Sequence, residues 1–112
     1  MSDARETLTA QLEAHYRSFG WKTAIRGNLV EAAGPGGVTW LGRAVVASEV
    51  NSDEFAVELA ALAERRMPQG GELCPLELLP AEDCEAPLRE LIERLGLGFR
   101  PHVSVYSLAA AA

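Results

Sequence analysis

The sequence has no apolar run that approaches the roughly 20 residues a helix needs to cross a bilayer. Its first residues, MSDARETLTAQ, are polar and acidic, whereas a secretory signal peptide is basic at first and then apolar. These two absences argue against a membrane protein and against an exported one, so we expect a cytoplasmic location. In that compartment the two cysteines, Cys74 and Cys84, would stay reduced.

Positive charge is also scarce. The 112 residues include 10 basic and 16 acidic side chains, which gives a formal net charge of −6, and Arg65–Arg66 is the one adjacent basic pair. Because an acidic surface repels phosphate backbones, this composition argues against binding to nucleic acid. Lys22 is the single lysine, and the excess of arginine and alanine suggests a GC-rich bacterial genome.

Length and composition fit one globular domain. Hydrophobic residues make up 48% of the chain and charged residues 23%, which is typical of folded proteins. A chain of 112 residues can bury one sizeable core but not two. We therefore expect a single domain over residues 1–108 and a frayed alanine-rich tail over residues 109–112.

Apolar periodicity predicts helices and strands in a definite order. Three segments combine helical spacing with capping residues and with a glycine or proline stop, namely 3–19, 51–66 and 83–95. Their predicted N-caps are Asp3, Asn51 and Asp83. Segments typical of strands are 21–26, 29–33, 38–47, 72–80 and 102–108.

This order predicts an α+β fold. Gly27–Asn28 permits either a tight hairpin turn or a bulge in one long strand. The last strand, helix and strand form a βαβ unit, whose two strands should be parallel. We therefore expect a single mixed sheet, built from an N-terminal antiparallel hairpin or meander and a C-terminal parallel unit, with three α-helices on one face.

The segment GPGG, residues 34–37, has the glycines of a phosphate-binding loop but not its surroundings. Such a loop leads from a strand into the N-terminus of a helix, whose backbone N–H groups bind the phosphate. Here the residues from Val38 onward are β-branched and aromatic, and no Lys-Ser or Lys-Thr pair follows the glycines. The segment predicts a turn between two strands, and we expect no nucleotide cofactor.

The cysteines and histidines do not form a complete motif. A strand of roughly 20 Å separates Cys74 from Cys84, which is too far for a disulfide. Cys84 begins a helix among acidic residues that oppose a thiolate, which favours an inert thiol. Cys74, Arg100 and His102 should lie together where two parallel strands begin. They could contact an anion, or His102 could simply bond a backbone carbonyl, and we expect no metal because four ligands are lacking.

Two further features remain open at this point. Glu77 alternates with leucines in a strand, so it is either a buried general base or a residue that faces solvent or an edge. Trp21 and Trp40 could share a sheet face with Tyr16 and Phe19. Those aromatic side chains would be core if a helix covers that face, or a patch for a partner if it does not.

The leading functional hypothesis is a non-catalytic module that self-associates or binds a protein partner. It rests on strands that are apolar on both faces, since Leu41 and Val45 alternate with Trp40 and Val46. One layer of helices would leave some of these uncovered, so the predicted interface comprises Trp21, Trp40 and Leu41. The alternative is a small-anion or small-ligand binder, or a minor enzyme, with its site at one end of the sheet. That site would lie near Arg100, His102 and Cys74 or near residues 82–84.

Overall fold

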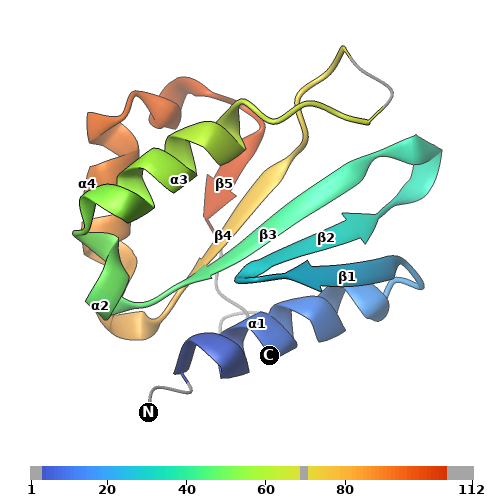
Figure 1. Ribbon diagram of the computed structural model, residues 1–112, viewed down its shortest axis with the longest axis horizontal. Coiled ribbons are helices and arrows are strands. Elements are labelled where there is room, and N and C mark those ends of the chain that lie inside the picture. The colour runs from blue at the N-terminus through green and yellow to red at the C-terminus, as the bar shows by residue number, and fades with distance from the viewer. Residues whose placement is uncertain (1–3, 69–70, 106–112) are drawn as a thin grey trace.

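The alternating segments form one five-stranded sheet in the computed structural model, which describes residues 4–68 and 71–105 (Figure 1). The strands are β1 (Lys22–Arg26), β2 (Leu29–Ala33), β3 (Thr39–Val45), β4 (Leu76–Pro80) and β5 (Val103–Val105). The α-helices are α1 (Ala4–Arg17), α2 (Ala47–Val50), α3 (Asp53–Ala63) and α4 (Glu85–Arg94). Short 3-10 turns are η1 (Pro35–Gly37), η2 (Glu82–Cys84) and η3 (Leu97–Phe99). The predicted cap Asp3, the end of the last predicted strand and the tail 109–112 lie outside the described residues.

The sheet is mixed, and its strand order follows the chain from β1 to β5. Strands β1, β2 and β3 are antiparallel, whereas β3, β4 and β5 are parallel. Arg26 pairs with Leu29, so Gly27–Asn28 is a two-residue hairpin turn and not a bulge. Gly27 has a φ of 64° and Asn28 has no positive φ, as in a type II′ turn. The predicted α+β fold is confirmed.

The GPGG segment connects the antiparallel strands β2 and β3, as predicted. The backbone N–H of Gly34 donates to the carbonyl oxygen of Val38 over 2.8 Å. Gly36 and Gly37 have φ values of 73° and 76°, which residues with a Cβ atom rarely adopt. The glycines therefore serve the turn.

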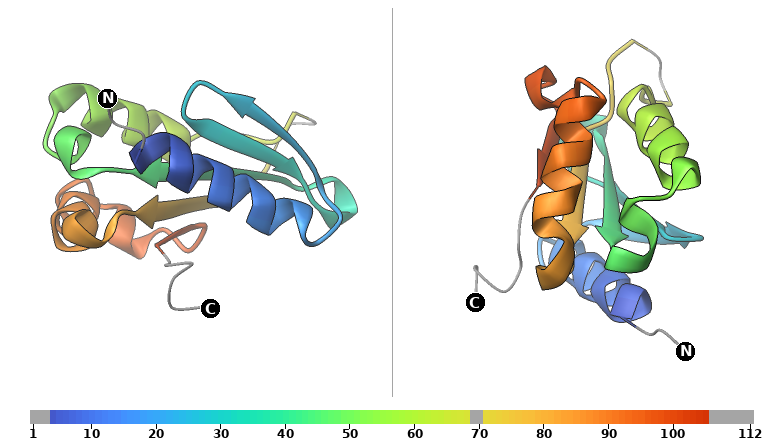
Figure 2. Two further views of the ribbon diagram at one scale, coloured as in Figure 1. Left: turned by 90° about the horizontal axis from the view of Figure 1, so that it is seen from below. Right: turned by 90° about the vertical axis from the view of Figure 1, so that its left-hand side faces the viewer.

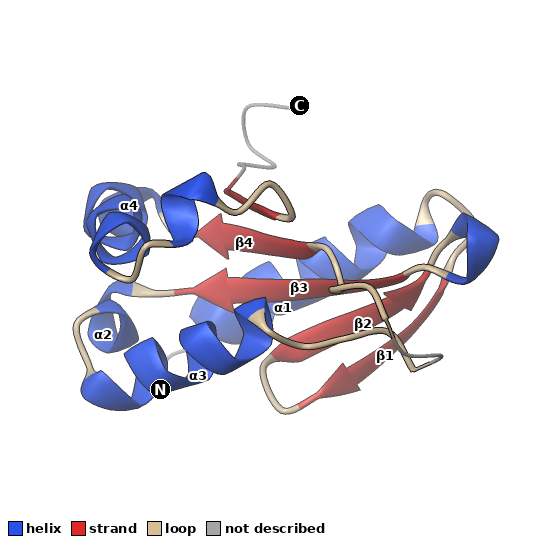
Figure 3. Ribbon diagram, turned by 90° about the horizontal axis from the view of Figure 1, so that it is seen from above, coloured by secondary structure: helices blue, strands red, loops and turns tan. Residues whose placement is uncertain are grey.

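Helices cover both faces of the sheet, which corrects the prediction that they share one. Figure 2 (left) shows α1 across the strands on the near face, and Figure 3 shows α1 behind the sheet with α3 in front. The physical reason is that both faces of β3 are apolar and each needs a cover. Leu41 packs with residues of α3 and α4 and is fully buried, so its assignment to an interface was wrong.

Two predicted helix starts are displaced by one residue. The chain forms the short helix α2 directly after β3, so that Asn51 ends α2 and does not cap α3. Ser52 is the N-cap instead, and its side chain accepts a hydrogen bond from the backbone N–H of Phe55 over 3.1 Å. Asp83 lies inside η2, which moves the N-cap of α4 to Cys84. A single turn of helix before each start shifts the cap, and sequence spacing did not reveal it.

A buried arginine ties β3 to the helices on its side. Arg43 is only 2% exposed, and its guanidinium donates to both carboxylate oxygens of Glu49 in α2 and of Glu58 in α3. It also lies 5.0 Å from the centre of the Phe55 ring. Burial raises the pKa of Glu49, but the hydrogen bonds and charge of Arg43 outweigh burial and leave that pKa below its usual value.

On the other face, α1 approaches β3 very closely at Gly42. A Cβ atom at Gly42 would lie 2.7 Å from Leu12 Cδ2 and 2.8 Å from the Tyr16 hydroxyl oxygen. Both of these side chains are buried, so neither can swing into solvent. The helix therefore requires glycine at this position.

We predict that Gly42→Ala lowers the free energy of unfolding by about 1–3 kcal/mol, because the added methyl group overpacks the contact between α1 and β3. Urea unfolding followed by far-UV circular dichroism measures this. Gly98→Ala is the matched control, since a Cβ atom there has no neighbour within 4 Å. Equal stability of the two variants would contradict the close contact.

We predict that Arg43→Leu lowers the free energy of unfolding by about 3 kcal/mol at pH 7, because Glu49 and Glu58 lose their buried partner and Glu49 keeps only the partly exposed Arg5. The deficit should shrink toward pH 4. The depressed pKa of Glu49 stabilises the wild type above the unfolded pKa of about 4.3, and that stability is lost as the pH falls toward the folded pKa. Urea titrations at several pH values measure the deficit, with the exposed Arg94→Leu as control. A deficit that does not depend on pH would refute the role of the pair.

Candidate functional site

A cavity of about 300 Å³ opens on the α1 side of the sheet. We call it the aromatic pocket, and its lining residues are His15, Tyr16, Phe19, Trp21, Trp40 and Glu77. They come from the end of α1, the segment that leads into β1, and the strands β3 and β4. Five of the six are aromatic rings and the sixth is a carboxylate.

The contact at Gly42 positions the inner end of the pocket. Tyr16 is 1% exposed, and its hydroxyl group donates a hydrogen bond to Glu77 Oε1 over 2.7 Å. Glu77 is the neighbour of Gly42 in the parallel ladder between β3 and β4. The tyrosine therefore reaches from α1 to the carboxylate across a strand position that has no side chain.

The two tryptophans form one wall. The ring centres of Trp21 and Tyr16 lie 6.0 Å apart at an interplanar angle of 12°, and those of Trp21 and Trp40 lie 5.5 Å apart at 32°. Trp40 also packs on Gly34, where a Cβ atom would lie 2.7 Å from its Nε1. Gly34, the first glycine of GPGG, thus makes room for this wall. The prediction of a turn did not include this role.

The pocket residues are neither all core nor all surface. Phe19 is 55% exposed and the tryptophans are partly exposed, whereas Tyr16 is buried. The core alternative therefore holds for Tyr16, whereas Phe19 and the two tryptophans are not fully covered. The interface role of Trp21 and Trp40 stays a prediction. Trp40 Nε1 is buried and has no hydrogen-bond partner among the described residues, so it does not serve as a donor at the pocket surface.

Glu77 is partly buried, and it does not lie at an edge because β4 runs between β3 and β5. Within residues 4–68 and 71–105, Glu77 forms no ion pair, although seven ion pairs are found elsewhere in those ranges. Its partner in that part of the chain is the neutral Tyr16 hydroxyl group. The sequence left its environment open because alternation fixes only the face of the sheet.

The predicted anion site has its polar groups engaged with other parts of the protein. Arg100, whose side chain is 33% exposed, pairs with Glu64 over 2.7 Å. His102 Nε2 lies 2.7 Å from the Ala63 carbonyl oxygen, which is the backbone contact proposed as its alternative role. Cys74 Sγ lies 4.0 Å from the sulfur of Met67. Contact of these residues with an anion stays a prediction.

Neither cysteine is part of a disulfide, as predicted, and both are buried. Burial raises the pKa of the Cys74 thiol and of the Cys84 thiol. The Cys84 thiol donates to the Val45 carbonyl oxygen over 3.2 Å. The described residues contain no group of three or more histidine, cysteine or acidic side chains that could hold a metal ion.

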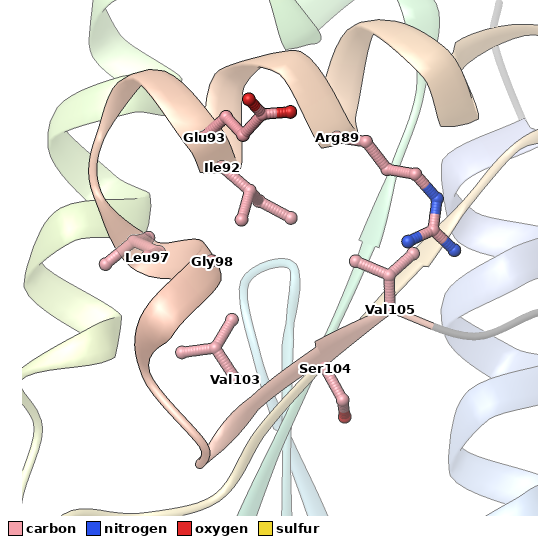
Figure 4. A pocket seen from close by; sticks show the side chains of 8 residues that line it. All are labelled: Arg89, Ile92, Glu93, Leu97, Gly98, Val103, Ser104 and Val105. Carbon is pink, nitrogen blue, oxygen red and sulfur yellow. The ribbon is translucent and has the colours of Figure 1, made fainter.

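A second cavity, of about 400 Å³, lies between α4 and β5 (Figure 4). Ile92, Val103 and Val105 point toward one another there, whereas Ser104 points to the other side of β5. Arg89 at its rim pairs with Glu85 over 3.0 Å. Because its polar groups do not converge, this cavity is a weaker candidate than the aromatic pocket.

No protein-family model matches the chain, and no curated protein or solved structure is significantly similar to it. Among the described residues, no helix has the length and apolar character that crossing a membrane requires. The assignment of a function therefore rests on the chemistry of the aromatic pocket.

We predict that the native protein does not react with a thiol reagent at pH 8, because both cysteines are buried with a raised pKa. Absorbance with Ellman's reagent should give two thiols per chain only after denaturation. Rapid reaction of the native protein would mean that one thiol is accessible and reactive.

Proposed function

We propose that the protein is a non-catalytic binding module, located in the cytoplasm, that engages a protein partner through the aromatic pocket. The supporting observation is the combination of partly exposed Trp21 and Trp40 with Glu77 around one cavity. Tryptophan and tyrosine dominate the energetics of protein interfaces, because they offer large contact areas and lose little side-chain entropy. A carboxylate at such a site adds specificity for one kind of partner.

A cavity favours a projecting side chain of a different protein over a second copy of this chain. Self-association was inferred from uncovered apolar strand faces, and the helices α3 and α4 now bury Leu41 on one of them. On the α1 side, a small group of partly exposed rings surrounds about 300 Å³ of space. That volume suits one large side chain, whereas a stable dimer buries a broad surface.

The test is a pull-down from cell extract with the wild type and two variants, read by quantitative mass spectrometry. We expect a protein that the wild type enriches to be lost with Trp21→Ser, which removes a wall of the pocket. Phe99→Ser is the matched control, because Phe99 is 93% exposed and does not line the pocket, and it should retain the protein.

Thermal unfolding must show that Trp21→Ser is folded at the temperature of the pull-down. A protein retained by all three forms would count against the pocket as the binding site. Sedimentation of the wild type tests whether the protein is a dimer. A dimer that Trp21→Ser dissociates would make a second copy the occupant and would contradict a separate partner.

A further inference from the structure

We infer that the side chain which enters the aromatic pocket is an arginine of the partner, and this inference rests on the proposed function. The guanidinium group would stack on the exposed face of Trp21 or Trp40 and pair with the Glu77 carboxylate. This names the chemistry of the ligand, which the proposed function leaves open.

The charge of the pocket comes from Glu77. Its carboxylate is partly buried, and within the described residues it has the hydrogen bond from Tyr16 but no cationic partner. Among the other partly buried carboxylates, Glu31 is paired with Arg26 and Arg65, whereas Glu13 accepts a hydrogen bond from Thr23 and does not line the aromatic pocket. A carboxylate without a cation in a partly desolvated site favours a positively charged ligand and repels an anion.

The rings favour the same kind of ligand. The face of an indole attracts a cation within about 6 Å of the ring centre, and tryptophan does so more strongly than tyrosine or phenylalanine. Trp21, Trp40 and Phe19 are all partly or largely exposed beside the carboxylate. An apolar ligand would use the rings but leave Glu77 desolvated and unpaired, which costs free energy.

Arginine fits this combination better than lysine does. The guanidinium is planar and weakly hydrated, it stacks on aromatic faces, and its N–H groups can donate in parallel to a carboxylate. Tyr16 holds one oxygen of Glu77 in place, which orients the carboxylate before a ligand binds. The chain's net charge of −6 also attracts a basic partner at long range.

The test is a titration with three tripeptides, acetyl-Gly-X-Gly-amide, in which X is arginine, lysine or citrulline. Citrulline has nearly the shape of arginine but no charge. The signal is intrinsic fluorescence, because the chain has two tryptophans and both line the pocket. We expect a saturable change with the arginine peptide, weaker binding of lysine, and at least about ten-fold weaker binding of citrulline, which cannot form charge-assisted hydrogen bonds.

Glu77→Gln should weaken the binding of the arginine peptide by about ten-fold, since the substitution removes the charge but keeps an oxygen that accepts the hydrogen bond from Tyr16. Glu93→Gln on the exposed side of α4 is the matched control and should bind like the wild type. Citrulline binding as well as arginine, an unchanged affinity of Glu77→Gln, or no saturable signal up to the solubility limit would overturn the inference. If the pull-down nevertheless finds a partner that depends on Trp21, the proposed function stands and only the arginine assignment fails.

Discussion

The close approach of α1 to β3 at Gly42 determines how one whole face of the sheet is arranged. A side chain at this buried position would collide with Leu12 and with Tyr16. Without one, the helix lies directly on the central strand, and the Tyr16 hydroxyl group reaches the carboxylate of Glu77 on the next strand. The ring of Trp21 then stacks on Tyr16, and Trp40 packs beside it. The aromatic pocket therefore depends on a single position at which the sequence supplies no side chain.

The next residue along β3 organises the opposite face by charge. Because neighbouring residues of a strand point to opposite sides, Arg43 faces away from α1 and into the other helical layer. A buried guanidinium is costly unless it is paired, so α2 and α3 must lie where Glu49 and Glu58 can reach it. One dipeptide of the central strand thus constrains both layers, by space on one side and by ion pairing on the other.

Local pattern predicts the elements of this fold better than it predicts what covers them. Alternation identifies β3 and its two apolar faces, whereas Gly27–Asn28 left a hairpin turn and a bulge both open until the pairing of Arg26 with Leu29 decided for the turn. Alternation does not tell whether a helix or a partner covers a face, because that depends on the path of distant segments. For this reason Leu41 was assigned to an interface although helices bury it. The one signal for Arg43 was a charge in the middle of an apolar strand, and its partners Glu49 and Glu58 are not identifiable from spacing.

In the candidate site, too, local pattern predicts some features, and others depend on distant segments of the chain. Trp21 and Trp40 were predicted as one cluster, but the depth of that cluster and the presence of Glu77 in it follow only from the register of β3 against β4.

The packing of these side chains also determines how the pocket can bind a ligand. Tyr16 is held by its contact with the strand and Trp21 by its contact with Tyr16, so the walls are ordered before any ligand arrives. Ordering of side chains is a major cost of association. A site whose side chains are already ordered therefore needs few contacts to bind a ligand. A cavity that takes a single side chain can therefore still contribute usefully to recognition, since its rings and its carboxylate are already in place.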